Sequence, residues 1–490
     1  MGGEETTTEE VAVQAARAPF LVRIFTEPMW VLGLVLLVDE VDKNIISGMV
    51  TPLKDEFGVG DAAIGLLFSM QLLFNGLITV PAGYLADRWN RKQAMGKTVV
   101  AWSGLTAAGA ASLNFPMLVG FRSMLGFGQA VSEPSAASLI GDYYPPDQRG
   151  RAFSIQQVML FVGTGVGVAL GGAISTTLGW RAALLIVALP GLLVALLAFR
   201  LREPKRGTAD LMAALGSGEI EHHEGEHEKL LEHGFRHFLR DMWDGLKADM
   251  RTVLNIRTMR YTLVGVAALL FTVTALARWL PQYYERHLYM KEGSGEALFG
   301  LMVVLGGVPG VLLGGRVADK YAPKLQGGRL ALPAIFLWIG VSLFTASFLV
   351  RPSAYNATAI GIVLVVQCAG FFITAMGIPA LRAGLTDALP AHLRGTGFGA
   401  FNLVAVLAGQ ATAPFVVAGL SSIFDENLRV AFLLVSPLSF LGAAILFRAR
   451  KFLDDDMQKI MMAVLTAMQE ERQRLAAEAE KAASPAETPT

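Results

Sequence analysis

Residues 83–92 read Gly-Tyr-Leu-Ala-Asp-Arg-Trp-Asn-Arg-Lys, and a similar stretch, Gly-Arg-Val-Ala-Asp-Lys, recurs at residues 315–320. Each stretch follows a long apolar run, so the two occupy equivalent places in the two halves of the chain. A second pair of related segments follows in the same order, at residues 134–150 and 379–395, each running from a Pro to an Arg-Gly. Two pairs of similar segments in the same order indicate an internal repeat. They predict that the two halves of the chain have related structures.

The composition is that of a membrane protein. Of the 490 residues, 53% are hydrophobic and 17% are charged, whereas an ordinary soluble domain has about 25% charged residues. The charges are concentrated, with 22 in residues 200–260 and 15 in residues 448–490. Lys plus Arg and Asp plus Glu each total 41, so no net charge favours nucleic acid. These values exclude a soluble globular enzyme, a disordered chain and a nucleic-acid binder.

Twelve apolar segments are long enough to cross ~30 Å of hydrocarbon, which takes about 20 helical residues each. They lie near residues 28–51, 62–85, 93–113, 116–143, 151–177, 180–200, 260–284, 297–318, 329–350, 356–386, 395–421 and 428–448. The expected division is an N-terminal segment at 1–27, a bundle at 28–200, a polar cytoplasmic linker at 201–259, a second bundle at 260–448 and a cytoplasmic tail at 449–490. The predicted fold is an all-α membrane protein with two pseudo-symmetric six-helix bundles.

The orientation follows from the Lys and Arg residues that flank the predicted spans. One side of the membrane has 14 of them and the other has 6, and the richer side is expected to be cytoplasmic. Both termini then face the cytoplasm. The polar N-terminus lacks a basic region before an apolar core, so we expect no cleaved signal. We predict a multi-pass protein of the cell's inner membrane that works as a monomer.

The 28–51 segment contains charged residues within its apolar run, among them Asp39, Asp42 and Lys43. Each such charge costs about 2.5–3.5 kcal/mol on insertion scales. Asp39 and Lys43 are four residues apart and can pair on one helix face, with Asp42 near that face and Glu40 rotated about 100° away. The cluster predicts either proton or gating chemistry beside a water-filled cavity, or a self-paired structural network.

Polar residues of the 116–143 segment share one helix face. Arg122, Gln129 and Glu133 are separated by seven and four residues, which aligns them along the helix. Arg122 is a candidate substrate or gating cation, or else a counter-ion to the acids of the first segment. Glu133 can carry a proton if its surroundings dry out, or it lies at the aqueous helix end. Arg278 in the 260–284 segment either binds a phosphate head group or reaches the membrane surface.

The 83–92 stretch resembles the signature loop of the major facilitator superfamily, and this resemblance covers nearly the whole chain. Within that superfamily the chain resembles the spinster family of lipid transporters, mainly in its first half. Val-Asp-Lys-Asn-Ile-Ile-Ser-Gly at 41–48 and Arg-Glu-Pro-Lys-Arg-Gly at 202–207 suggest this. The resemblance implies a bacterial transporter of an amphiphile, such as a lysophospholipid or a sphingosine-1-phosphate-like lipid. It also ranks Asp42 above Asp39 as the proton or gating site.

One residue departs from the spinster pattern, which resembles Gly-Glu-Ala where this chain has Gly128-Gln129-Ala130. An amide therefore occupies the place of a carboxylate. Either another group such as Glu133 titrates instead, or the chain was altered to mimic a protonated Glu. Proton-coupled transport after Gln129→Glu would separate this residue from the others.

The repeated loop has a mechanical interpretation. Gly83 lets its helix approach a neighbour closely. Asp87 can accept hydrogen bonds from the free N–H groups at the N-terminus of a helix. The resemblance implies that this helix is the 395–421 segment. Asp87 can also pair with Arg149. We expect these contacts to latch the cytoplasmic ends together, although the loop could instead serve only as a basic anchor. The other residues of this motif are Arg88, Arg91, Lys92 and, in the second copy, Asp319.

The predicted function is secondary active transport by alternating access, coupled to protons. No Gly-rich loop ends in Gly-Lys-Ser/Thr, so no ATP-binding motif is expected, and neither enzyme activity, cofactor nor metal is predicted. The His residues of the 201–259 linker are interpreted as a solvated segment. A lipid-like substrate, protons and membrane lipids are the expected partners. The alternatives are a proton-driven drug or small-metabolite porter and a non-transporting receptor or scaffold.

Overall fold

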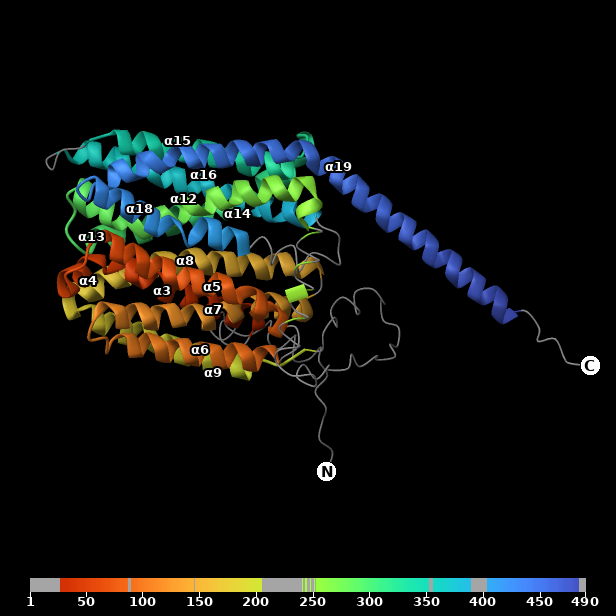
Figure 1. Ribbon diagram of the computed structural model, residues 1–490, viewed down its shortest axis with the longest axis horizontal. Coiled ribbons are helices and arrows are strands. Elements are labelled where there is room, and N and C mark those ends of the chain that lie inside the picture. Colours follow the sequence, from red (N-terminus) through yellow and green to blue (C-terminus); the bar gives the residue numbers. More distant parts are fainter. Residues whose placement is uncertain are drawn as a thin grey trace, which may run out of the picture.

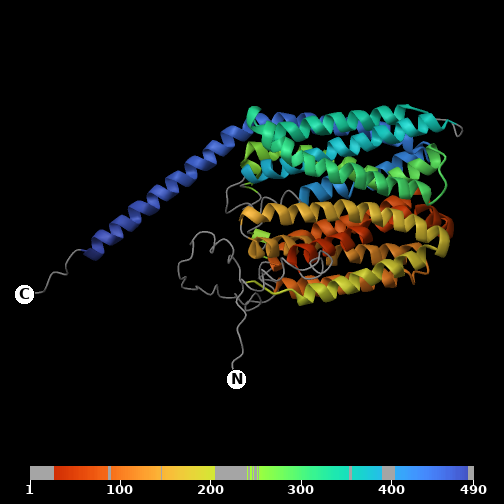
Figure 2. The same ribbon diagram turned by 180° about the vertical axis from the view of Figure 1, so that it is seen from behind.

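The computed structural model describes residues 27–86, 90–144, 146–204, 240, 243–244, 247, 251, 253–351, 356–388 and 403–483. Within these ranges the regular elements are helices. They form two groups that lie side by side, one from each half of the chain (Figures 1 and 2). The long helix α19 continues away from the bundles beyond their edge (Figure 1).

The first bundle is built from helices of the N-terminal half. They are α3 (Pro28–Ile45), the 3₁₀ turn η1 (Ile46–Gly48), α4 (Val50–Phe57), α5 (Asp61–Ala86), α6 (Arg91–Gly109), α7 (Phe115–Tyr143), α8 (Pro146–Leu178) and α9 (Trp180–Arg200). The second bundle contains α12 (Arg257–His287), α13 (Ser294–Met302), the π-helical segment η2 (Val303–Gly307), α14 (Val308–Tyr321), the turn η3 (Ala322–Lys324), α15 (Gly328–Leu349), α16 (Ala357–Asp387), the π-helical segment η5 (Ala405–Gln410), α18 (Ala413–Ile423) and α19 (Leu428–Ala483).

The predicted all-α, twelve-span fold is confirmed, because each predicted segment coincides with one of these helices or a run of them. Among the described residues, nine helical stretches are long and apolar enough to cross a membrane by length and composition. The helices at the other three predicted spans, α3, α6 and α7, are more polar. In α3 the four charged residues Asp39, Glu40, Asp42 and Lys43 lower the mean hydropathy of the helix.

Local sequence sets where several helices begin and break. Pro28 lies in the first turn of α3, where its missing N–H costs nothing. The Asn90 and Asn114 side chains cap α6 and α7. Each accepts a hydrogen bond from the backbone N–H three residues later, that of Gln93 and that of Met117 respectively. At the break after α3, a Cβ on Gly48 would lie 2.1 Å from the Val168 carbonyl oxygen, so only glycine permits this close approach to α8.

The helices run between two ends of the molecule. We call one the Asp61 end, where the chain passes through residues 46–61, 287–294 and 423–428. The other is the Arg91 end, where α6 begins at Arg91 and α3 and α12 also begin. The long C-terminal part of α19 extends from the Arg91 end (Figure 2).

The apolar core differs between these two ends. Toward the Asp61 end, one continuous cluster of buried side chains includes residues from both bundles, such as Ile45, Phe68, Trp279 and Phe432. Toward the Arg91 end there are two separate clusters. One of them lies in the first bundle and the other in the second. Among the described residues, the bundles therefore share a core at the Asp61 end and have separate cores toward the Arg91 end.

Two sets of helices make the largest contacts between the bundles. Helix α5 packs on α18 and η5, and α8 packs on α13 and η2. Both contacts are close: a Cβ on Gly65 would lie 2.6 Å from the Ala418 Cβ, and a Cβ on Gly165 would lie 2.5 Å from the Gly300 carbonyl oxygen. Small residues allow such approaches in membrane helices, so glycines set the distance between the bundles on both sides.

Candidate functional site

The charged residues of α3 pair with one another. The Lys43 ammonium lies 2.5 Å from Asp39 Oδ2, as their spacing predicts, and 3.1 Å from Glu40 Oε1. The long lysine side chain thus reaches Glu40 as well, although this residue lies on a different face. Glu40 Oε2 also accepts from the Thr164 hydroxyl of α8 at 3.2 Å. The cluster therefore joins α3 to α8 inside the first bundle.

Asp42 is the centre of a second network, which joins α3, α6 and α7. It is 2% exposed. Its Oδ1 accepts from Thr106 Oγ1 at 2.9 Å and from Arg122 Nη1 at 3.3 Å, and its Oδ2 accepts from Gln129 Nε2 at 3.3 Å. Gln129 Oε1 in turn accepts from Gln71 Nε2 of α5 at 3.1 Å. The sequence-predicted residues Asp42, Arg122 and Gln129 therefore form one contiguous site.

Two polar atoms of this region lack hydrogen-bond partners among the described residues. They are Nη2 of Arg122 and Oδ1 of Asp39, and both are buried. A buried polar atom without a partner costs about 1–3 kcal/mol, and more when it belongs to a charged group. Such a cost is offset when a ligand or a proton completes the hydrogen bonds. The site thus presents one free guanidinium donor and one free carboxyl acceptor.

Arg278 of α12 lies in the contact between bundles rather than at the membrane surface. It is 4% exposed, which argues against a side chain that reaches the interface. Its Nη1 donates to the Lys43 carbonyl oxygen and, at 3.3 Å, to the Ser47 hydroxyl, and its guanidinium lies over the Phe68 ring. The break after α3 leaves carbonyl groups without helical partners, and Arg278 satisfies one of them from the opposite bundle.

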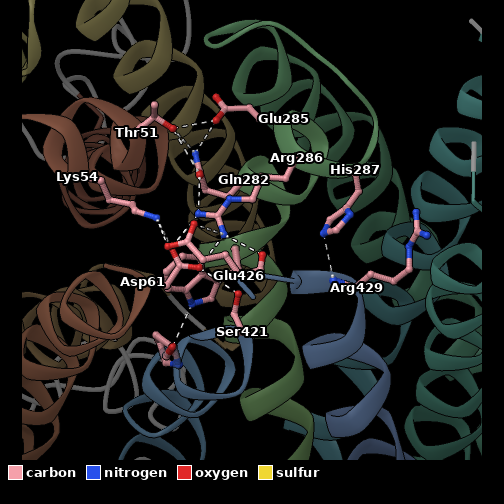
Figure 3. A network of polar contacts seen from close by, with 12 residues as sticks. Thr51, Lys54, Asp61, Gln282, Glu285, Arg286, His287, Ser421, Glu426 and Arg429 are labelled. Carbon is pink, nitrogen blue, oxygen red and sulfur yellow. Dashed lines mark hydrogen bonds and ion pairs between the residues drawn. The ribbon is translucent and has the colours of Figure 1, made fainter. Parts of the chain in front are cut away.

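A network of ion pairs joins the two bundles at the Asp61 end (Figure 3). Asp61 at the start of α5 is 0% exposed and accepts both Nη groups of Arg286 from α12, at 2.6 and 2.8 Å. It also accepts from Lys54 Nζ at 2.9 Å and from the Ser421 hydroxyl at 3.0 Å. Lys54 further pairs with Glu426 at 2.8 Å. The bidentate arginine pair is a strong and geometrically specific interaction.

At the Arg91 end, the ion pairs of Arg91 lie within the first bundle and its flanking segment. Arg91 is buried and pairs with Asp142 of α7 and, at 2.8 Å, with Glu203 after α9. Its Nη2 also donates to the Pro204 carbonyl oxygen at 2.9 Å. The Lys92 backbone N–H donates to Glu203 at 3.0 Å. Arg91 therefore ties three parts of the first bundle together instead of serving only as a surface anchor.

Several predicted residues are not placed by the structure. Asp87 and Arg88 lie outside the described residues, as do the side chains of Gly83, Glu133 and Arg149. The predicted latch around Asp87 therefore remains a prediction. Its counterpart in the second repeat, Asp319, is exposed on α14.

Sequence reasoning missed the Asp61 network entirely. Asp61 and Arg286 are separated by 225 residues, and nothing local links them. A weak signal was available, because Lys54, Asp61, Arg286 and Glu426 all lie next to predicted spans on the side with fewer basic residues. Charges of both signs at span ends on that side suggest pairing between them.

Comparison with known proteins gives the family. The sequence profile of the Major Facilitator Superfamily matches residues 32–409. The chain belongs to the Major Facilitator Superfamily. That assignment agrees with the two related bundles and with the repeated loop.

Within the superfamily the chain is similar to spinster proteins. It is 24% identical to Protein spinster of Drosophila melanogaster over 68% of this chain, which spans about half (51%) of that relative. It is also 24% identical to a probable L-galactonate transporter of Escherichia coli K12, covering 90% of this chain and 92% of that protein. A solved bacterial homologue of human spinster, in an inward-facing and unoccupied conformation, has the same fold, with a TM-score of 0.70 and 21% identity over 88% of this chain and 98% of that one.

Proposed function

We propose that this superfamily member moves an amphiphilic lipid, such as a lysophospholipid, by proton-coupled alternating access. The observation that carries the proposal is the difference between the two ends of the bundle contact. Shared core and ion pairs close the Asp61 end, while the cores separate toward the Arg91 end. The buried charges of α3 and α7 lie between these regions. This arrangement fits a transporter that is closed at the Asp61 end.

The asymmetry of basic residues supports an orientation. The Arg91 end carries the Lys- and Arg-rich loops, which favours a cytoplasmic location for this end and for both termini. In a bacterial inner membrane this state would then open toward the cytoplasm. The inward-facing state of the solved spinster homologue is consistent with this orientation.

The unpartnered donor of Arg122 supports a substrate with a negatively charged head group. Its Nη2 is buried and has no hydrogen-bond partner among the described residues, while Nη1 holds Asp42. A phosphate accepts hydrogen bonds from guanidinium with favourable geometry. Lys43 and Arg278 supply further positive charge on the neighbouring helices. The likeness to spinster proteins supports the lipid class.

Proton coupling is assigned to the acids of α3. Asp42 accepts hydrogen bonds from Thr106, Arg122 and Gln129, and its protonation would weaken its hold on Arg122 and free that guanidinium for substrate. Gln129 cannot titrate, and this leaves Asp42, Asp39 and Glu40 as the carboxyl groups of the described site. Arg122 thus responds both to the proton and to the lipid head group.

A second candidate is a proton-driven porter of small polar metabolites. The L-galactonate relative favours it, because the two proteins match over nearly their full lengths. Such a substrate also carries a carboxylate that an arginine can bind. The two candidates differ in the apolar tail, which only a lipid would place in the bundle contact.

Uptake by purified protein in liposomes tests the proposal. Labelled lysophospholipids and labelled sugar acids are offered with and without an imposed proton gradient. We expect gradient-driven lipid uptake that Arg122→Ala reduces at least about tenfold, equal to about 1.4 kcal/mol. Arg181→Ala is the matched control, because Arg181 is exposed at the Asp61 end and pairs only within the first bundle. Sugar-acid uptake without lipid uptake would favour the second candidate.

A further inference from the structure

Two glutamates lie against each other at the Asp61 end, beside the ion-pair network. Glu285 is in the last turns of α12 and Glu296 is in the first turn of α13. Glu296 is 1% exposed and packs against the opposite bundle. A Cβ on Gly172 of α8 would lie 2.7 Å from the Glu296 Cβ. A carboxyl group is therefore sealed inside the contact between the two bundles.

Each glutamate of this pair has one carboxyl oxygen without a hydrogen-bond donor among the described residues. Glu285 Oε2 accepts from the Thr51 hydroxyl at 2.9 Å and from Gln282 Nε2 at 2.8 Å (Figure 3). Glu285 Oε1 and Glu296 Oε2 are buried and have no donor among the described residues. The two residues are close neighbours, because a Cβ on Gly295, the residue before Glu296, would lie 3.7 Å from Glu285 Cγ. Two buried carboxylates side by side repel each other, and a proton on one of them removes the repulsion and supplies a hydrogen-bond donor.

The cations beside the pair hydrogen-bond to other groups, although Arg286 also interacts electrostatically with Glu285. The nearest guanidinium, Arg286, gives both Nη groups to Asp61, and Lys54 bonds Asp61 and Glu426. Further negative charge lies close by, because burial and the charges of Glu285 and Asp55 raise the pKa of Glu292 in the connecting loop. The groups that face the pair are Thr51 and Asp55 of α4, Gln282 and Arg286 of α12, Glu292 of the loop and the uncharged Gly172 of α8.

We propose that Glu285 and Glu296 together bind one proton in the contact between bundles, and that this proton holds the Asp61 end closed. The site is separate from Asp42 and belongs to the gate rather than to the substrate region. This inference rests on the proposed alternating-access function. When the proton leaves, two negative charges face each other in a dry contact. Separation of the bundles lets water reach both carboxylates and relieves the repulsion.

The direction of the pH effect follows from linkage. The closed state binds the proton more tightly than the open state, in which water solvates the ionised pair. Acid therefore favours closure of the Asp61 end, and rising pH favours its opening. If the Asp61 end faces the outside, an external proton would promote closure after substrate has been exchanged. Proton entry and closure of the outer gate would then be one event.

Spin labels on the two bundles measure this equilibrium directly. Leu178 at the end of α8 and Ile423 at the end of α18 are exposed and belong to different bundles. Cysteines at these positions, in a Cys368→Ser background, report the distance across the Asp61 end. In the otherwise unchanged protein we expect the open fraction to rise at least about threefold between about pH 5 and about pH 9.

Neutral variants give the decisive comparison. Glu296→Gln and Glu285→Gln each mimic the protonated pair, because an amide can donate to the remaining carboxylate. We expect both to stay closed at every pH and to lose the pH response. Glu56→Gln is the matched control, since Glu56 lies at the same end but bonds Trp180 and Arg181 within the first bundle, and it should keep the response. In infrared difference spectra, Glu296→Gln should remove the carbonyl band of a protonated carboxyl group.

Three results would overturn the proposal. The first is an unchanged pH response in both Gln variants, and the second is an infrared band that persists in them. The third is closure driven by sodium or calcium ions at constant pH, which would make the pair a metal site. Liposome uptake in the same variants separates this inference from the proposed function. A pH-dependent distance without lipid uptake would refute only the lipid substrate, and lipid uptake with a pH-independent distance would refute only the proton site.

Discussion

The two ends of the molecule hold charged side chains in different ways. At the Asp61 end, Asp61 and Arg286 come from different bundles, and Asp61 is fully buried beside a shared apolar core. At the Arg91 end, Arg91 and Asp142 come from the same bundle, whose core is separate from that of its partner. Ion pairs within a bundle can persist while the bundles rock, whereas pairs between bundles must break. Under the proposed alternating-access function, the Asp61 end is therefore the part of the contact that must open.

The largest effect is expected when this inter-bundle pair is broken. Asp61→Asn removes the charge that holds Arg286 and Lys54. Loss of one partner of a buried pair costs about 3–5 kcal/mol, so the open fraction at the Asp61 end should rise more than about a hundredfold. The Leu178–Ile423 spin-label distance measures the change. Asp319→Asn is the control, because this aspartate is exposed at the other end, and equal effects of the two substitutions would refute the assignment.

A smaller effect is expected from crowding the helix contact itself. In Gly165→Ala the new Cβ would lie 2.5 Å from the Gly300 carbonyl oxygen, which forces α8 and α13 apart. Overpacking costs about 1–3 kcal/mol, so the closed state should lose stability relative to the open one. Gly120→Ala in α7 is the comparison, since nothing lies within 4 Å of its added Cβ. A bundle distance that is the same in both variants would show that this contact does not control opening.

Arg91→Ala removes an ion pair within one bundle at the Arg91 end, for comparison with the inter-bundle pair at the Asp61 end. It leaves Asp142 and Glu203 without their shared partner, and lost hydrogen bonds to charged groups cost about 1.5–3 kcal/mol. Because these groups lie in one bundle, we expect a lower melting temperature with an unchanged Leu178–Ile423 distance. Thermal unfolding of purified protein checks the first part. A large shift in the spin-label distance would mean that Arg91 acts on the gate.

The smallest effect concerns Glu56, which is at the Asp61 end but pairs within the first bundle. The Trp180 indole donates to its Oε2 at 2.5 Å, and this bond, with the Arg181 guanidinium, holds the pKa of Glu56 below its ordinary value. A lowered pKa gives stability that is present above the unfolded-state pKa and is lost as pH falls through the folded-state pKa. The pair is partly exposed, so less than about 1 kcal/mol is expected.

Melting curves at several pH values test this expectation. The protein and Glu56→Gln should differ slightly near neutrality and converge in acid, while the distance across the Asp61 end stays the same in both. A difference that grows in acid would have the wrong sign for this carboxylate.

Local features of the sequence were sufficient to predict much of the fold and part of the site. The spans follow from runs of apolar residues, and the Lys43–Asp39 pair follows from the four-residue helical spacing. The Asp42–Arg122–Gln129 site was reached because the family resemblance and the shared helix face point to the same residues. The position of Arg278 could not be derived, since its partners Lys43 and Ser47 are on a helix of the other bundle.

The residues of the Asp61 network and Glu296 were missed for the same physical reason. Asp61, Arg286 and Glu426 each look like ordinary charges at the end of a span, where water satisfies them. Only the tertiary contact buries Asp61 completely and brings its partners together. Glu296 reads as a common first-turn acid of a helix, and its burial against Gly172 depends on how the two bundles meet.

The central claim is that the Asp61 end opens as the Arg91 end closes. Two distances measured on the same preparation test it most directly: Leu178 to Ile423 at the Asp61 end, and Arg200 to Gln326 at the Arg91 end. We predict that raising the pH in the presence of lysophospholipid lengthens the first distance and shortens the second. Asp61→Asn should change both distances in the same way at constant pH. Both distances changing in the same direction, or transport with neither changing, would contradict the account.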